Sequence, residues 1–274
     1  MNRTPLFLLL SLLLLSMASA LIVAQEKPKN EAPQSEVSKD PPKDSKASTP
    51  AAAMPAVDEI LDKYVKALGG KETLEKLNTR IIKGSLDIDA MNMGGSFEKF
   101  DKAPNKSSTR ISIQGFGDIN SVYDGTKGWA VDPFTGFREL SGIELAATKR
   151  EADFRSALNF KKNYTKLEVK GKEKVESSEA YVVEATPAEG GDPEKFYFDV
   201  KSGLIVRHDS ERESPQGKLS AEEYLTDYKE IDGVKIPFTT KFVTPAFALT
   251  FKIAEVQHNA EIDEAKFNKP SATQ

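Results

Sequence analysis

Near the end of the chain, apolar and polar residues alternate so regularly that the segment is suited only to strands with one apolar face. The apolar members share one parity before Pro245 and the opposite parity after it: Val234, Ile236, Phe238 and Phe242, then Phe247, Leu249, Phe251 and Ile253. Successive side chains of a strand point to opposite faces, and antiparallel sheets commonly bury one face and expose the other. The pattern therefore predicts an antiparallel sheet whose apolar face needs a cover.

Comparable strand-like segments occupy most of the chain from Ile82 onward, about ten in all. Two turns between them have clear signatures. Asp232-Gly233 has the composition of a two-residue hairpin turn, and Gly203 stands where a three-residue hairpin loop needs a left-handed residue. Both turns predict that consecutive strands pair locally and antiparallel.

Three segments have helical periodicity instead. In residues 57–68 apolar side chains recur three and four positions apart, and Gly69-Gly70 ends the stripe. Residues 71–77 predict a short second helix, and residues 140–158 a longer one that interrupts the strands. Because so few helices cannot roof about ten strands, we expect the sheet to curl over its own apolar side. The interior is then either filled with side chains or hollow, and the pattern allows both.

The N-terminal residues predict export. Residues 1–24 have the order of a secretory signal peptide, with an Ala-Ser-Ala cleavage step ending at Ala20. The apolar run continues to Ala24, so cleavage after either alanine and retention as a membrane anchor are all open. Residues 25–55 are rich in Lys, Glu, Ser and Pro, which predicts a disordered linker. The folded domain is expected over residues 56–270, in the periplasm.

The overall composition excludes several classes of protein. The chain has no cysteine, which excludes a lipidated N-terminal anchor, disulfides and thiolate metal sites. Its formal net charge is −4, with Lys and Glu interspersed and no basic stripe. Such a surface has no electrostatic footprint for nucleic acid. We expect a monomeric domain that is stabilised by burial of its core.

Catalytic chemistry has little support in the sequence. The only histidines are His208 and His258, which we place at strand ends on the surface. Metalloprotease, phosphate-loop, dinucleotide-binding and serine-hydrolase motifs are absent. The acidic residues mostly alternate with apolar residues or adjoin lysines, as on a solvated face. We predict a protein that is not an enzyme and needs no metal or cofactor. A hydrolase with a dispersed pair of carboxylates is the last alternative.

One aromatic segment has two interpretations. Trp129 is the only tryptophan and follows a tight turn, and Phe134 and Phe137 flank Thr135-Gly136 just before the interrupting helix. Aromatic rings beside a glycine hinge suit the edge of a lid over an apolar pocket. They equally suit a plug that closes one end of a filled core.

Several short motifs together resemble a known family. They are Ala67-Leu68-Gly69-Gly70, Gly128-Trp129 before a helical insertion, Tyr197-Phe198-Asp199 with Ser202-Gly203-Leu204-Ile205, the run from Asp227 to Pro237, Val256-Gln257-His258-Asn259, Ile262-Asp263 and Phe267. Over residues 56–270 the chain resembles the LolA-like outer-membrane lipoprotein-sorting proteins of Gram-negative bacteria and their broader relatives.

This resemblance implies an α+β fold: a curved antiparallel half-barrel with an N-terminal helix and a helical lid, whose apolar interior shelters acyl chains between membranes. In carriers of this family an arginine on a strand latches the lid, and Arg80 and Arg110 lie on early strands here. The long linker departs from the compact carrier pattern. We therefore predict a more general binding protein for lipid or lipoprotein acyl chains, with envelope membrane proteins as further partners.

The expected ligand site combines inner strand positions with the aromatic segment and the lid. Its predicted residues are Leu86, Phe97, Ile113, Trp129, Phe134, Phe137, Leu140, Phe154, Phe198, Phe242 and Phe251. The competing prediction is a structural or interaction domain of the envelope with a filled core, which would bind partners at an exposed edge strand.

Overall fold

The structure is a computed structural model, and it describes residues 54–89, 93–133, 135–214 and 217–271. The predicted signal peptide, residues 25–53 of the predicted linker, and Phe134 lie outside these ranges. None of the helices within the described residues is long and apolar enough to span a membrane.

The described residues form one open, antiparallel sheet of 13 strands. The first six form a meander: β1 (Thr79–Ile88), β2 (Met93–Lys102), β3 (Lys106–Ile113), β4 (Gly117–Tyr123), β5 (Gly128–Asp132) and β6 (Gly136–Glu139). The other seven form a second meander: β7 (Tyr164–Val175), β8 (Ser178–Pro187), β9 (Glu194–Asp199), β10 (Ile205–Ser214), β11 (Gly217–Ile231), β12 (Val234–Val243) and β13 (Ala248–His258). β1 pairs with β13 and joins the two meanders, so β6 and β7 are the open edges. The predicted number of about ten strands was too low.

Short helices accompany the sheet. Their bounds are α2 (Val57–Leu68), α3 (Lys71–Glu75), α4 (Gly142–Glu151), α5 (Phe160–Asn163) and the 3-10 helix η3 (Glu264–Phe267). The helix predicted over residues 140–158 is interrupted after α4. Asp153 accepts hydrogen bonds from the Arg155 backbone N–H and from the side-chain amides of Asn159 and Asn163, which stabilises a turn between α4 and α5.

Both hairpins predicted from the sequence are present. Asp232 and Gly233 have φ of 53° and 75° and join β11 to β12, where Ile231 pairs with Val234. Gly203 has φ of 77° and lies in the loop between β9 and β10. The left-handed backbone explains the glycine at each turn.

The strand register defines two faces of the sheet. Directly paired residues of antiparallel strands lie on the same face. The row Ile82, Lys99, Thr109, Ser121 and Ala130 runs across β1 to β5 on what we call the inner face. The row Leu86, Phe251, Thr240 and Leu225 continues the inner face across β13, β12 and β11. The row Ile81, Phe100, Ser108, Val122 and Trp129 lies on the outer face.

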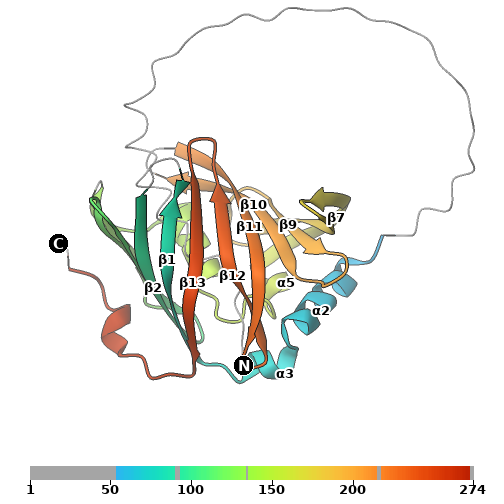
Figure 1. The fold of residues 1–274 in the computed structure, drawn as a ribbon, viewed down its shortest axis with the longest axis horizontal. Helices are drawn as coiled ribbons and strands as arrows, with labels where there is room; N and C mark the ends of the chain where they lie inside the picture. The colour runs from blue at the N-terminus through green and yellow to red at the C-terminus, as the bar shows by residue number, and fades with distance from the viewer. Residues whose placement is uncertain (1–53, 90–92, 134, 215–216, 272–274) are drawn as a thin grey trace, which may run out of the picture.

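The sheet curves around its inner face, and Figure 1 shows α2 and α3 beside the half that ends in β7. On that half, Tyr64 of α2 packs edge-on against Phe198, with 5.4 Å between the ring centroids. Residues 140–163, here called the crossing segment, connect the open edge β6 to the open edge β7. Phe154 of this segment is buried among inner-face side chains, so the segment passes over the inner face.

Candidate functional site

The inner face holds a large apolar cluster, here called the main cluster. It joins side chains of both meanders with two residues of the crossing segment, Leu140 and Phe154. Phe97 and Phe251 meet edge-on near its centre, with 5.4 Å between ring centroids. Ridges of aromatic and branched side chains of this kind give most of the stabilisation of a curved sheet.

A second apolar cluster, here called the α2 cluster, fills the half of the inner face near β7. It contains the buried stripe of α2, formed by Ile60, Leu61, Tyr64 and Leu68, packed against Phe160, Phe196 and Phe198. The predicted N-terminal helix thus covers the inner face as well.

The predicted site residues are distributed over several places. The main cluster contains seven of them: Leu86, Phe97, Ile113, Leu140, Phe154, Phe242 and Phe251. Phe198 belongs to the α2 cluster. The structure therefore brings most of the predicted residues together on one face, but under two different covers.

Trp129 and Phe137 lie on the other side of the sheet. Trp129 pairs with Val122 in the outer-face row, and Phe137 pairs with Val131 on the same face. Lys269 of the C-terminal segment places its ammonium group 4.9 Å from the Phe137 ring. Every residue of β5 is buried, so alternation gave no sign of which face is which. These two side chains do not contact the inner-face clusters.

The main cluster on the inner face is filled with side chains. Leu86, Phe242 and Phe251 have 0% of their surface accessible and Phe97 has 1%. A void that admits a water molecule would leave accessible surface on the side chains that line it. An alkyl chain therefore requires part of the inner face to be uncovered.

A set of charged side chains on the inner face was not predicted. We call it the polar band, and its members are Arg80, Lys99, Asp101, Arg150, Glu151, Glu194, His208, Arg212 and Glu223, each of whose side chains is at most 11% exposed. It contacts both apolar clusters, since Arg80 lies 5.6 Å from the Phe154 ring and His208 stacks on Phe196 at 4.3 Å.

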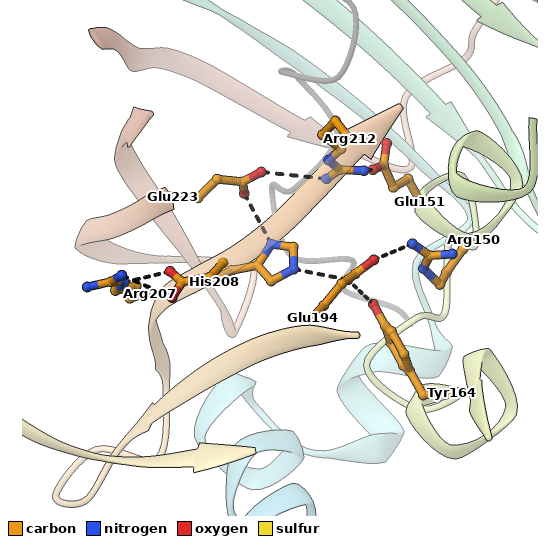
Figure 2. A network of polar contacts seen from close by, with 9 residues as sticks. Arg150, Glu151, Tyr164, Glu194, Arg207, His208, Arg212 and Glu223 are labelled. Atoms are coloured by element: carbon orange, nitrogen blue, oxygen red, sulfur yellow. Dashed lines mark hydrogen bonds and ion pairs between the residues drawn. The ribbon is translucent and has the colours of Figure 1, made fainter. Parts of the chain in front are cut away.

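One half of the polar band is centred on Glu194 and His208, as Figure 2 shows. The His208 Nε2 atom lies 3.0 Å from Glu194 Oε2, and the Tyr164 hydroxyl donates to the same oxygen at 2.8 Å. Arg150 of α4 donates to the other oxygen of Glu194. On the opposite side of the ring, His208 Nδ1 lies 3.7 Å from Glu223.

The other half lies on β1 and β2. Asp101 Oδ2 accepts hydrogen bonds from Arg80 Nη2 at 2.7 Å and from Lys99 Nζ at 2.9 Å, and Asp101 Oδ1 accepts one from Ser107 at 2.9 Å. Two buried cations thus share one carboxylate, which is an expensive arrangement in a low-dielectric interior.

Glu151 of α4 connects the two halves. Its carboxylate is bonded to Arg212 of β10, and Arg212 lies 3.7 Å from Glu223. In Figure 2, Arg212 stands between these two carboxylates. The negative charge of Glu151 also reaches Lys99. Two consecutive residues of α4, Arg150 and Glu151, therefore make ion pairs with the inner face.

The electrostatics of the polar band follow from burial and pairing. Burial disfavours the charged form of His208, but Glu194 and Glu223 outweigh it and raise the pKa of the imidazole to about 9. Burial would raise the pKa of Glu194, but His208 and Arg150 hold it far below its usual range. Burial lowers the pKa of Lys99 to about 8, against the opposing charges of Asp101 and Glu151. At neutral pH these three groups are therefore charged.

The surface placement of the two histidines needs correction here. His208 is 2% exposed in the middle of β10, and the His258 side chain is 2% exposed beside Asp232, so neither histidine lies on the surface. Of the two candidate latch arginines, Arg80 is buried against Phe154, whereas Arg110 is an exposed partner of Asp118.

Comparison with known proteins rests on structure alone, because no family model matches the chain and no curated protein resembles it in sequence. A DUF1329 family protein from Desulfovibrio piger has a TM-score of 0.54 and 15% identity, over 77% of this chain and 97% of that one. A LolA superfamily protein from Nitrosomonas europaea has a TM-score of 0.53 and 13% identity, over 79% and 99%. A putative outer membrane lipoprotein-sorting protein domain from Vibrio parahaemolyticus has a TM-score of 0.52 and 12% identity, over 77% and 97%.

This chain has a LolA-like fold. The crossing segment is the part of this LolA-like fold that lies over the polar band. Beside it opens a polar cleft of about 400 Å³. Its lining includes Asn105 of the β2–β3 turn and Arg155 of the crossing segment.

Proposed function

We propose that this protein is a non-catalytic binding protein of the cell envelope that takes up the alkyl chain of a lipid or lipoprotein on its inner face. The crossing segment acts as the lid. When this segment lifts, the alkyl chain of the ligand enters the main cluster. There it lies among the inner-face residues predicted from the sequence. The predicted export to the periplasm is part of this proposal.

The observation that carries the proposal is the chemistry of the contact between α4 and the sheet. Within α4 only Thr148 and Glu151 are buried and Leu145 alone packs, partly buried, against the main cluster, so this helix has no continuous apolar stripe of its own. It is attached by Arg150–Glu194 and Glu151–Arg212, and near its start by Arg138–Glu144 at 2.6 Å. Charged groups that become exposed to water regain hydration in place of their protein partner, whereas apolar surface does not. A cover attached in this way is suited to removal.

The anchors on either side of α4 are different. Leu140 and Phe154 belong to the main cluster, and the Phe154 backbone N–H donates to the Pro104 carbonyl at 3.0 Å. A ligand chain that replaces these two side chains would restore the apolar contacts they give up. Burial of a chain is worth about 0.8 kcal/mol per methylene group. The name of one similar structure, a putative outer membrane lipoprotein-sorting protein domain, agrees with such a ligand.

A tether across the lid tests the proposal. The chain has no cysteine, so Asn105→Cys and Arg155→Cys can be joined by a short bismaleimide across the cleft that both residues line. We expect each single variant, and the double variant before cross-linking, to bind a fluorescent C16 fatty acid. The cross-linked protein should bind at least about tenfold more weakly. Equal binding before and after cross-linking would refute the role of the crossing segment as a lid.

The filled inner face favours a second candidate, an interaction domain whose core never opens. It predicts no uptake of the fatty acid by any of these proteins and no lipid in native mass spectra of the gently purified protein. Its partners would then bind at an open edge strand, β6 or β7.

A further inference from the structure

Glu151 is the only acidic residue that the crossing segment contributes to the polar band. Two basic residues of the sheet act on its carboxylate. Arg212 bonds to this carboxylate directly. The charge of Glu151 also acts on Lys99, which already shares Asp101 with Arg80. Arg212 and Lys99 are thus the sheet cations on which the Glu151 carboxylate acts.

We propose that Glu151 occupies the place of a ligand's anionic group, so that the ligand is an anionic amphiphile whose head pairs with Lys99 and Arg212 when the crossing segment lifts. This inference rests on the proposed function and names the chemical class of its ligand. The sheet then supplies two cations for the head group and the apolar main cluster for the tail.

The charge balance of the sheet supports the proposal. Among the members of the polar band on the sheet, the cations are Arg80, Lys99, His208 and Arg212, and the anions are Asp101, Glu194 and Glu223. Glu194 and Glu223 flank His208, and Glu223 also lies 3.7 Å from Arg212, so without the crossing segment four sheet cations face three carboxylates. Unpaired buried cations are costly, and a ligand anion removes that cost.

The hollow beside Glu151 is too small for the head. A hollow of about 40 Å³ touches Glu151, Arg212 and His208, which is room for a water molecule or two. A carboxylate or phosphate group with its alkyl chain needs more, so it must displace Glu151. Lys99 follows Phe97 by two residues on the inner face of β2, which places the tail in the main cluster when the head reaches Lys99.

Two ligands that differ only in their head group test the inference. Dodecanoate and dodecan-1-ol have the same chain, and the carboxylate is ionised at pH 7.5. In titration calorimetry we expect the protein to bind dodecanoate at least about tenfold more tightly, as one charge-assisted contact predicts. In Lys99→Met that ratio should fall to about twofold or less. The control Lys83→Met removes an exposed lysine of β1, paired with Glu98, and should keep the wild-type ratio.

Glu151→Gln provides a second measurement that does not depend on the stability of the Lys99 variant. Loss of the competing carboxylate should strengthen dodecanoate binding, by about fivefold or more, and more than it strengthens dodecanol binding. Equal affinity of the wild-type protein for the acid and the alcohol would overturn the inference while leaving the proposed function intact. Binding of neither ligand would overturn the proposed function, and this inference with it.

Discussion

Asp101 is the residue on which half of the polar band depends. It is 3% exposed and neutralises only part of the charge of Arg80 and Lys99. Burial works against the carboxylate, but the two cations hold the pKa of Asp101 below its usual value. Lys99 is the second cation on this carboxylate. When Lys99 is removed, Arg80 keeps Asp101 as its partner.

Asp101→Asn and Lys99→Met should therefore have opposite consequences for stability. Asp101→Asn removes the carboxylate that Arg80 and Lys99 share and should lower the free energy of unfolding by about 3–5 kcal/mol. Lys99→Met removes one of those cations and should be within about 1 kcal/mol of the wild type, or more stable. Urea unfolding measures both. A Lys99→Met variant as unstable as Asp101→Asn would contradict this account of the charge balance.

His208 should make the protein less stable as the pH rises from neutral. Its folded pKa of about 9 lies above the ordinary value of 6.5, so its contribution is complete below pH 6.5 and is lost as the pH rises through 9. Between pH 6.5 and 8 the free energy of unfolding should fall by about 1–2 kcal/mol. His208→Gln should be less stable throughout and lack this fall. Parallel profiles for the two proteins would show that the imidazole is not charged in the fold.

At the scale of elements, the strand pattern was informative wherever one face is apolar and the other wet. β12 and β13 have their apolar residues on the parity read from the sequence. β5 is covered on both faces, and β6 has only four residues, so neither showed alternation. This is why the number of strands was underestimated and Trp129 was assigned to the wrong face.

The attachment of α4 can be measured by hydrogen exchange. Glu151→Gln weakens its bond to Arg212, and a charge-assisted bond is worth about 1.5–3 kcal/mol. Backbone amides of α4 should then exchange about tenfold faster, while those of β12 and β13 keep their protection. Glu222→Gln is the matched control, because Glu222 forms an ion pair with Arg207 at 2.8 Å on the outer face. Faster exchange throughout the sheet would mean that Glu151 stabilises the whole fold and not the cover.

For the molecule as a whole, the sequence predicted a curved sheet with its apolar side turned inward, because that follows from patterning and from the shortage of helices. The polar band could be predicted only in part. Lys99 and Asp101 share the parity of Phe97, and Arg80 that of Ile82, which marks them as inward-facing. On β10, the apolar residue that shares the parity of His208 and Arg212 is Val206, which the irregularity between Ile205 and Arg207 turns toward an outer-face cluster. The burial of His208 and Arg212 therefore depends on contacts with β9, β11 and α4 that sequence spacing does not reveal.

The location of a bound alkyl chain tests the central claim most directly. A C16 fatty acid with a photoreactive diazirine in its chain can be cross-linked to the purified protein, and the labelled residues identified by mass spectrometry. We expect labels on inner-face residues of the main cluster, such as Phe97, Phe251 and Phe154, and their loss when positions 105 and 155 are tethered. Labels confined to outer-face residues such as Trp129 or Phe137, or no specific label at all, would contradict a ligand site under the crossing segment.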